Sequence, residues 1–268
     1  WYGVMNMYKV LTIAGSDCSG GAGIQADIKT ITAHGMYAMS AITSLTAQNT
    51  TGVYGVMDST PEILGKQLDC IFNDIFPDAV KIGMVSDKEL IKVIAEKLKE
   101  YKPKNIVLDT VMVATSGSPL LKPDSVNALI EELIPLATVI TPNIPEAEVL
   151  GNCKIECEKD LKDTAIALYE KYGCNVLVKG GHLNDTATDI LCCNGEITEF
   201  KGERIDNNNT HGTGCTLSSA IACNLAKGLD LPDAIRNSKE YLVGALKYNL
   251  NIGKGNGPLN HCYKIMED

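Results

Sequence analysis

Short runs of apolar residues alternate with stretches of mixed polar and apolar character along most of the chain. Several of the runs are continuous, which is typical of strands buried on both faces of a parallel sheet. The runs predict strands at 9–14, 37–47, 52–58, 79–84, 105–111, 137–141 and 175–179. The mixed stretches predict helices near 22–34, 61–73, 87–101, 123–134 and 158–173. This alternation is typical of an α/β fold with a mostly parallel sheet.

The segment 188–200 breaks this rhythm. Asn194 and Gly195 form a hairpin turn signal within it, so we expect antiparallel strands at an edge of the sheet. Two more helices are predicted at 213–228 and 232–249. No linker, repeat or charge block divides the chain, and we therefore expect one doubly wound domain from residue 8 to residue 268. Residues 1–7 are interpreted as an N-terminal extension or a tag remnant.

Composition narrows the function classes. The net charge is −9 and no Lys/Arg clusters occur, which argues against nucleic-acid binding. None of the ten cysteines forms a CxxC pair, and the four histidines complete no zinc spacing. We therefore expect free thiols and no structural zinc. No secretory signal or apolar run of membrane-spanning length is found, so a cytoplasmic location is expected.

The loop GSDCSGGAGIQAD, residues 15–27, lies between a predicted strand and a predicted helix, where glycine-rich loops commonly bind phosphate. Its first glycines have the spacing of a P-loop, but Gly21 and Ala22 stand where that motif needs Lys and Ser or Thr. Residues 21–26 match a dinucleotide fingerprint, yet no acidic residue follows at the distance that ribose binding requires. A loop that only packs a helix against the sheet is the alternative. Asp27 would either favour the helix dipole or point into a cleft.

A second glycine loop, NTHGTGC at residues 209–215, precedes a clearly helical stretch. Gly212 and Gly214 allow successive N–H groups to turn toward one point, and the helix N-terminus adds positive potential. The loop therefore predicts an anion-binding site, with an ordinary helix entry as the alternative. Cys215 lies at the helix start, where a thiol pKa is commonly lowered, so we expect a base beside a bound phosphate. The alternative for Cys215 is a small core residue.

Several longer motifs occur in order from about residue 8 to about residue 258. They are GSDCSGGAGIQADIKT, SLTAQNT, KIGM, VLDTVMVATSG, ITPNIPEAEVL, VLVKGGH and NTHGTGCTLSSA. Together they resemble the hydroxymethylpyrimidine/phosphomethylpyrimidine kinases of thiamine biosynthesis. That family belongs to the ribokinase-like superfamily and is closely related to one type of pyridoxal kinase. The resemblance implies a ribokinase-like three-layer α/β/α domain.

The resemblance also implies site residues. The pyrimidine pocket would be lined by Ala22, Asp27, Gln48, Met84 and Val111. Asp109 and Glu146 would organise Mg²⁺, with Asn143 as the first residue of the family's NxxE pattern. The nucleotide phosphates and the transferred phosphoryl group would be held by Lys179, Thr210, Gly212, Thr213 and Gly214. Cys215 would accept the proton from the substrate hydroxyl.

One departure from the wider superfamily concerns this proton. Much of the superfamily ends the same loop in DTxGAGD, whose last Asp is the base. Here Asn209 and Cys215 replace the two acids, as they do in the kinases that the chain resembles. Phosphoryl transfer depends more on positioning and charge neutralisation than on early proton removal, so a thiolate is a sufficient base.

The implied activity is transfer of phosphate from ATP, with Mg²⁺, to 4-amino-5-hydroxymethyl-2-methylpyrimidine. A second transfer to the monophosphate would give the diphosphate. The alternative is a pyridoxal/pyridoxine kinase, because both substrates are small heteroaromatic rings that bear a hydroxymethyl group. A non-catalytic binding protein on this fold is expected to lack Asp109, Glu146 or the second glycine loop, and all three are present. The resemblance further implies a homodimer.

Overall fold

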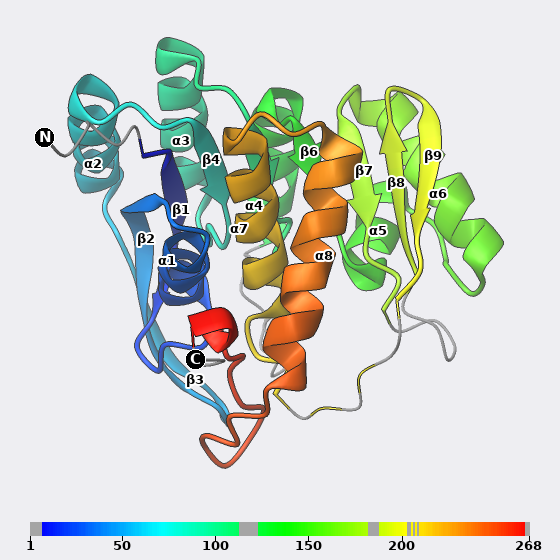
Figure 1. The fold of residues 1–268 in the computed structure, drawn as a ribbon. Helices are drawn as coiled ribbons and strands as arrows, with labels where there is room; N and C mark the ends of the chain where they lie inside the picture. Colours follow the sequence, from blue (N-terminus) through cyan, green and yellow to red (C-terminus); the bar gives the residue numbers. More distant parts are fainter. Residues whose placement is uncertain are drawn as a thin grey trace, which may run out of the picture.

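A nine-stranded sheet forms the centre of the computed structural model, which describes residues 7–112, 123–181, 188–202, 205, 207 and 209–265 (Figure 1). The strand order is β3-β2-β1-β4-β5-β6-β7-β8-β9. The bounds are β1 Lys9–Asp17, β2 Tyr37–Asn49, β3 Gly52–Asp58, β4 Ala79–Ile82, β5 Ile106–Leu108, β6 Val139–Ile140, β7 Asn175–Val178, β8 Asp189–Cys193 and β9 Glu196–Phe200.

Six neighbouring strands of the sheet, from β2 to β7 in spatial order, are parallel. The β8–β9 hairpin is antiparallel, and its turn residues Asn194 and Gly195 both have positive φ, at 51° and 83°. This confirms the predicted antiparallel edge. The opposite edge is antiparallel as well, because β3 folds back along β2 through a short turn. The predicted mostly parallel α/β sheet is therefore confirmed.

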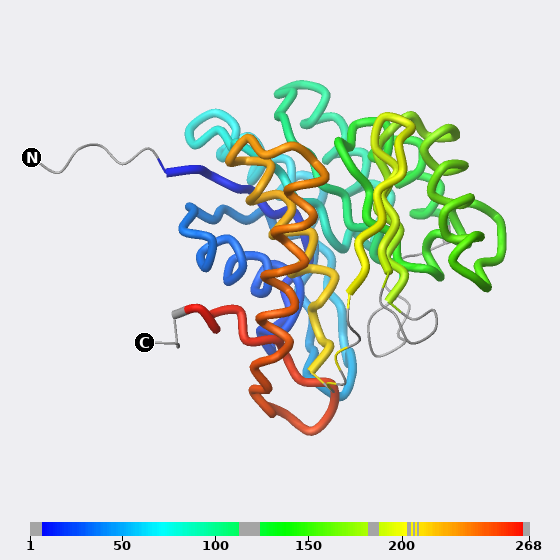
Figure 2. The backbone as a smooth tube through the Cα atoms, turned by 45° about the vertical axis from the view of Figure 1, so that its right-hand side comes forward, coloured from blue at the N-terminus to red at the C-terminus, as the bar shows by residue number. Residues whose placement is uncertain are grey.

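Helices cover both faces of the sheet and give three layers (Figures 1 and 2). Their bounds are α1 Gly23–Ala33, α2 Pro61–Asp74, α3 Lys88–Tyr101, α4 Pro123–Ala128, α5 Ile144–Gly151, α6 Glu158–Tyr172, α7 Thr213–Ala226 and α8 Leu231–Lys247. Helices α1, α7 and α8 lie on one face, and α2 to α6 lie on the other. A π-helical turn, Leu129–Leu133, and a 3₁₀ turn, Ile134–Leu136, follow α4.

An apolar core on each face of the sheet holds these layers together. Successive strand residues point to opposite faces, so Val10 packs in the core under α7 and α8 while Leu11 packs in the core under α2 and α3. Val107 and Leu108 of β5 also point to opposite faces, Val107 into the core under α7 and α8 and Leu108 into the core under α2 and α3. Burial on both faces explains why these strands are written as continuous apolar runs.

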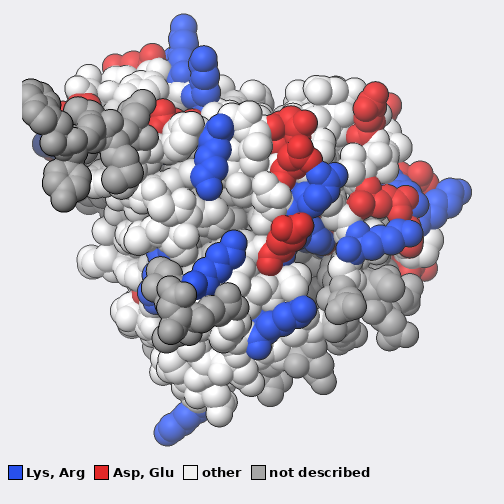
Figure 3. Space-filling view, in the orientation of Figure 1, with Lys and Arg blue, Asp and Glu red and all other residues white. Residues whose placement is uncertain are grey.

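The parallel strands end at a common edge, which lies toward the bottom of the view in Figure 1. Asp109, Thr141 and Lys179 follow β5, β6 and β7 there, and Asp17 is the last residue of β1. Ligands of doubly wound folds bind at this edge. The described residues contain no helix that is long and apolar enough to cross a membrane. On the face shown in Figure 3, described basic and acidic side chains are interspersed and form no large basic field.

Candidate active site

Asp109 is the centre of a polar cluster at the ends of β5, β6 and β7. It is 2% exposed, and its Oδ1 lies 3.0 Å from both Lys179 Nζ and Thr141 Oγ1. Ser218 of α7 donates to Oδ2 at 3.3 Å. Burial by itself would raise the pKa of Asp109, but the ammonium groups of Lys179 and Lys81 hold it below its ordinary value. Asp109 is therefore a buried, ionised carboxylate.

Glu146 joins this cluster from the first turn of α5. Asn143 is the N-cap of that helix, its side chain accepts from Glu146 N, and Glu146 Oε2 accepts from Asn143 N at 3.0 Å. Thr110 donates to the same carboxylate at 3.1 Å. Burial raises the pKa of Glu146, Lys179 acts against this, and the negative charge of Asp109 raises it further. The two carboxylates thus interact, which favours a bound cation.

Lys179 connects the carboxylates to the second glycine loop. Its side chain is 17% exposed and pairs with Asp109 at 3.0 Å. Burial would lower the pKa of Lys179, but the charges of Asp109 and Glu146 raise it, so the ammonium stays protonated. A Cβ added to Gly214 would lie 3.4 Å from Asp109 Oδ2 and 3.5 Å from Lys179 Nζ. Gly214 therefore faces this ion pair directly.

The loop before α7 has the geometry of an anion-binding site. Gly212 is the N-cap of the helix at φ 87°, and Thr213 N and Thr213 Oγ1 both donate to Thr210 O. The first N–H groups of a helix have no acceptor within it, and they carry the positive end of the helix dipole. Because Gly214 faces Lys179, this positive end and an ammonium are directed at the same region.

Cys215 differs from the sequence-based expectation. Burial raises the pKa of the Cys215 thiol to about 11, and the carboxylates of Asp27 and Asp109 act in the same direction. Lys81 and an N–H from Gly23 lower it by less. The predicted lowering at the helix start is therefore wrong, since desolvation by burial outweighs the groups that favour the thiolate. Cys215 nevertheless lies close to Asp109 and to the start of α1.

Asp27 lies in a buried network that the sequence did not reveal. The side chain is 0% exposed, and Lys81 Nζ lies 3.0 and 2.9 Å from its two oxygens. Thr12 and Ser219 donate to the same carboxylate at 2.6 and 2.8 Å. Burial would lower the pKa of Lys81, but the Asp27 charge raises it above the ordinary value. Both Asp27 oxygens are thus engaged by protein side chains, and contact between this carboxylate and a ligand ring stays a prediction.

Asp17, also missed from the sequence, organises the first glycine loop. Ser19 donates to Oδ1 through its N–H and its hydroxyl, at 2.8 and 2.7 Å. Gly21 N and Ala22 N donate to Oδ2 at 3.2 and 2.9 Å, and His211 Nε2 lies 2.8 Å from the same oxygen. Burial would raise the pKa of Asp17, but these hydrogen bonds, His211 foremost, lower it to about 2.

The other residues that are expected to bind the substrate ring lie around the same strand ends. Ala22 is the N-cap of α1, and Gln48 Nε2 lies 3.4 Å from His211 Nε2. Met84 is 9% exposed, and a Cβ on Gly15 would lie 2.7 Å from its Cε. The N–H of Val111 donates to Asp109 O at 2.8 Å, which places Val111 beside the carboxylate cluster. The structure therefore brings the expected residues to one edge, with Asp27 buried beneath them.

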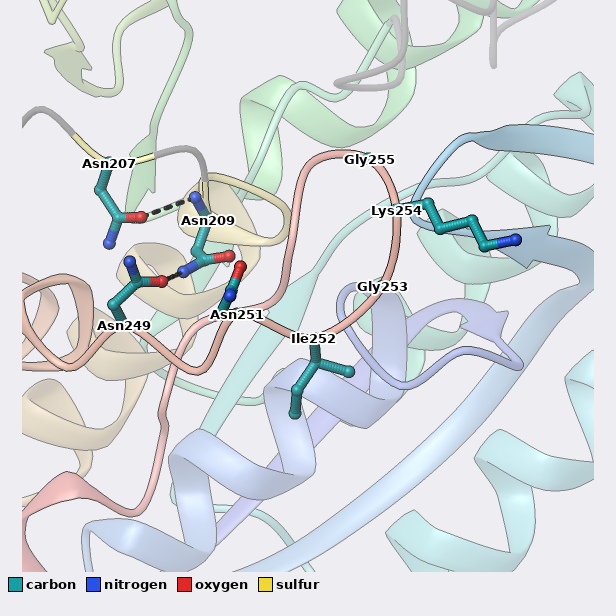
Figure 4. A pocket seen from close by; sticks show the side chains of 8 residues that line it. All are labelled: Asn207, Asn209, Asn249, Asn251, Ile252, Gly253, Lys254 and Gly255. Atoms are coloured by element: carbon teal, nitrogen blue, oxygen red, sulfur yellow. Dashed lines mark hydrogen bonds between the residues drawn. The ribbon is translucent and has the colours of Figure 1, made fainter.

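A polar cavity of about 440 Å³ adjoins the second glycine loop (Figure 4). Asn209, in that loop, hydrogen-bonds to both Asn207 and Asn249. The lining residues are Asn207, Asn209, Asn249, Asn251, Ile252, Gly253, Lys254 and Gly255. No single motif predicted this cavity, because its walls come from two segments about forty residues apart.

The arrangement suits phosphoryl transfer to a small acceptor. A helix N-terminus and Lys179 provide positive potential for phosphates, and two carboxylates provide oxygen ligands of the kind that Mg²⁺ prefers. Ala22, Gln48 and Met84 supply backbone, amide and apolar groups, the kinds of group that bind a small ring.

Comparison with known proteins agrees with this chemistry. A family model described as phosphomethylpyrimidine kinase matches residues 17–260. A hydroxymethylpyrimidine/phosphomethylpyrimidine kinase from Rhizobium meliloti (strain 1021) is 48% identical over 262 residues, which cover 96% of this chain and 98% of that protein.

Two solved structures are similar over most of the chain. The phosphomethylpyrimidine kinase from Clostridium difficile 630 has a TM-score of 0.80 at 48% identity, covering 88% of this chain and 98% of that one. The pyridoxal kinase from Staphylococcus aureus in complex with AMP-PCP and pyridoxal has a TM-score of 0.88 at 32% identity, covering 97% and 95%. Fold, site and sequence similarity thus agree, and the chain belongs to the phosphomethylpyrimidine kinase family.

Proposed function

We propose that the protein transfers the γ-phosphoryl group of ATP to the hydroxymethyl group of 4-amino-5-hydroxymethyl-2-methylpyrimidine, and then phosphorylates the monophosphate to the diphosphate. The observation that carries this proposal is the position of Gly214, whose missing side chain would contact both Asp109 and Lys179. It puts a helix N-terminus, an ammonium and two carboxylates around one region. Such convergence is the main requirement of phosphoryl transfer, which depends on positioning and charge neutralisation.

The nucleotide phosphates would lie at the start of α7. In this proposal Lys179 neutralises charge on the transferred group, while the N–H groups of Gly212 and Gly214 donate to its oxygens. Thr210, which accepts from Thr213, fixes the loop that presents them. The similarity to a kinase solved with AMP-PCP supports this use of ATP.

Asp109 and Glu146 fit a magnesium ion. Both are buried, and the raised pKa of Glu146 reflects burial together with the negative charge of Asp109. No group of three His, Cys, Asp or Glu side chains gathers as a metal cluster within the described parts of the chain. That agrees with Mg²⁺ chemistry, since this ion is commonly held by one or two carboxylates together with waters and substrate phosphates. When bound, it would neutralise phosphate charge.

The acceptor ring would lie beside the first glycine loop. Ala22 allows backbone to approach the ring, Gln48 offers an amide to its edge, and Met84 and Val111 offer apolar surface. Asp27 supports this pocket from below through its ion pair with Lys81. Cys215 would take the hydroxyl proton, and its thiol must first lose its own proton because the pKa is raised.

Steady-state kinetics with two acceptors test the substrate. The purified chain, with ATP and Mg²⁺, is expected to have a higher kcat/KM for the aminopyrimidine than for pyridoxal, because identity is 48% to the pyrimidine kinase and 32% to the pyridoxal kinase. A higher kcat/KM for pyridoxal than for the aminopyrimidine would contradict the proposed substrate.

We also propose that the protein is a cytoplasmic homodimer. All ten cysteines are unpaired, as expected in a reducing compartment. The β2–β3 ribbon exposes Leu45, Tyr54, Val56 and Met57 by 46%, 69%, 49% and 63%, which is typical of a covered surface. In analytical sedimentation, Met57→Lys should shift the protein from dimer toward monomer. Val149→Lys changes an exposed apolar position on α5 and should leave the dimer unchanged. The same dimer fraction in both variants would contradict an interface on the β2–β3 ribbon.

A further inference from the structure

The two glycine loops contact each other through positions that have no side chain. A Cβ on Gly212 would lie 2.0 Å from Gly21 O, and a Cβ on Gly21 would lie 2.3 Å from the His211 ring. No other residue type fits either position without displacing backbone or ring. The loop on the acceptor side, residues 17–22, therefore packs directly against the loop on the phosphate side, residues 209–215.

Asp17 and His211 are the polar contact across this junction. Their side chains are almost fully buried, with 3% and 9% exposed, and the Oδ2–Nε2 distance is 2.8 Å. The same Oδ2 accepts from the N–H groups of Gly21 and Ala22. On the other side, the N–H of His211 donates to Gly257 O at 3.1 Å, which ties its loop to the C-terminal turn.

We propose that Asp17 and His211 are positioning residues that clamp the acceptor loop onto the phosphate loop. This inference rests on the proposed function. Neither residue contacts the reacting atoms; the pair sets the distance between the acceptor hydroxyl, held beside Ala22, and the phosphoryl group, held beside Gly214. Phosphoryl transfer is sensitive to this distance because most of the catalytic effect comes from positioning.

Gln48 lies beside this pair. The Asp17 carboxylate only accepts hydrogen bonds, so His211 Nε2 must carry the hydrogen that points at it. Gln48 Nε2 lies 3.4 Å from the same nitrogen and, being a donor itself, cannot donate to it. Thr46 Oγ1 lies 3.0 Å from Ser16 O and 3.1 Å from Gln48 Oε1, so its one hydrogen is shared between these two acceptors and the Gln48 oxygen faces Thr46. The Gln48 N–H groups therefore remain available for an acceptor atom on a bound ring.

Three variants and two readouts test the clamp. His211→Leu removes the ring donor, whereas His211→Gln retains an N–H donor at similar reach. His34→Leu is the matched control, because His34 is a partly buried histidine at the C-cap of α1, where its Nδ1 lies 2.8 Å from Thr30 O. The first readout is kcat and KM for the acceptor and for ATP. The second is amide hydrogen exchange at Gly21 and Ala22, measured without substrates.

His211→Leu is expected to lower kcat/KM for the acceptor about 100-fold, with the KM for ATP near the wild-type value. It should also accelerate exchange at Gly21 and Ala22, about 190 residues away in the sequence. His211→Gln should recover most of both effects, and His34→Leu should show neither. A His211→Leu enzyme with wild-type kinetics and exchange would overturn the clamp. Equal losses for acceptor and ATP, with no recovery in His211→Gln, would reduce the pair to a general structural contact and also overturn it.

Failure of the proposed function would look different. In that case the wild-type chain would phosphorylate no aminopyrimidine, while the exchange measurement would still report whether His211 holds the acceptor loop.

Discussion

At the scale of single residues, burial decides the chemistry of Cys215 more than its place in a helix does. The helix start and Lys81 favour the thiolate, yet the thiol keeps its proton because it is desolvated and lies near the carboxylates of Asp27 and Asp109. A bound cation and phosphates would change this balance of charge. Turnover should therefore depend on pH through this thiol.

The first prediction concerns that dependence. Below its pKa of about 11, the thiolate fraction of Cys215 rises with pH, so wild-type kcat is expected to rise from pH 6.5 to 9.5. Cys215→Ala should lower kcat about 100-fold and remove the rise. Initial-rate measurements across this range check it, with Cys262→Ala, at an exposed cysteine, as the control. A Cys215→Ala enzyme with the wild-type slope would exclude the thiol as the base.

The second prediction concerns the buried Lys81–Asp27 pair. Lys81→Met leaves the Asp27 carboxylate buried without its counter-ion, which should reduce the free energy of unfolding by about 3–5 kcal/mol. Adding Asp27→Asn should recover part of this loss. Because the pKa of Lys81 is raised from 10.5, the pair contributes fully at neutral pH and weakens only at higher pH.

Urea unfolding measures both effects. The matched control is Lys97→Met, which breaks the Lys97–Asp69 pair between α2 and α3, where the side chains are 21% and 38% exposed. That pair should contribute less than about 1 kcal/mol to the free energy of unfolding. Equal losses in Lys81→Met and Lys97→Met would contradict a buried, tightly coupled pair.

The residue roles that sequence reasoning missed share one cause. Asp17 and His211 are 194 positions apart, and Lys81 and Asp27 are 54 apart. No local spacing rule joins such positions, so His211 was considered only as a zinc ligand. Asp109 and Glu146 were found because each follows a recognisable strand or lies in a family motif.

At the scale of elements, the apolar pattern predicted the strands and the layer order but not every boundary. Helix α5 was missed, although Asn143, Pro145 and Glu146 form a helix-start signal with a capping box. The strand expected at 105–111 is only Ile106–Leu108, and the next residue, Asp109, belongs to the polar cluster at the sheet edge. The expected helix 123–134 is α-helical only to Ala128 and continues as a π-helical turn and then a 3₁₀ turn.

The third prediction tests the junction at the start of α7. Gly212 and Gly228 flank this helix, and both have φ 87°. Alanine in the left-handed region costs about 1–2 kcal/mol at either position. At Gly212 a Cβ would also meet Gly21 O at 2.0 Å, whereas at Gly228 nothing lies within 4 Å.

Gly212→Ala should therefore lose more stability than Gly228→Ala and should also lose activity, with a raised KM for ATP. Thermal unfolding and kinetics of the two variants give the comparison. Similar kinetics in both would show that close contact between the loops is not needed for turnover.

At the scale of the whole molecule, one sheet edge gathers groups from widely separated segments. The strand ends supply Asp109 and Lys179, α5 supplies Glu146, and the loop before α7 supplies the helix N-terminus. The fold could be predicted from the pattern of apolar residues and from the family motifs, since both are read from short stretches of sequence. The contact between the two glycine loops could not be predicted, because it joins residues that are far apart in the sequence and meet only in the folded chain.

The most direct measurement is the time course of products from the purified chain with ATP, Mg²⁺ and 4-amino-5-hydroxymethyl-2-methylpyrimidine, followed by mass spectrometry. We expect the monophosphate to form first and the diphosphate to follow, with two ADP released for each pyrimidine consumed. Asp109→Asn should abolish both steps, because one site serves them. Absence of either phosphorylated product from the wild-type chain, or unchanged rates in Asp109→Asn, would contradict the account.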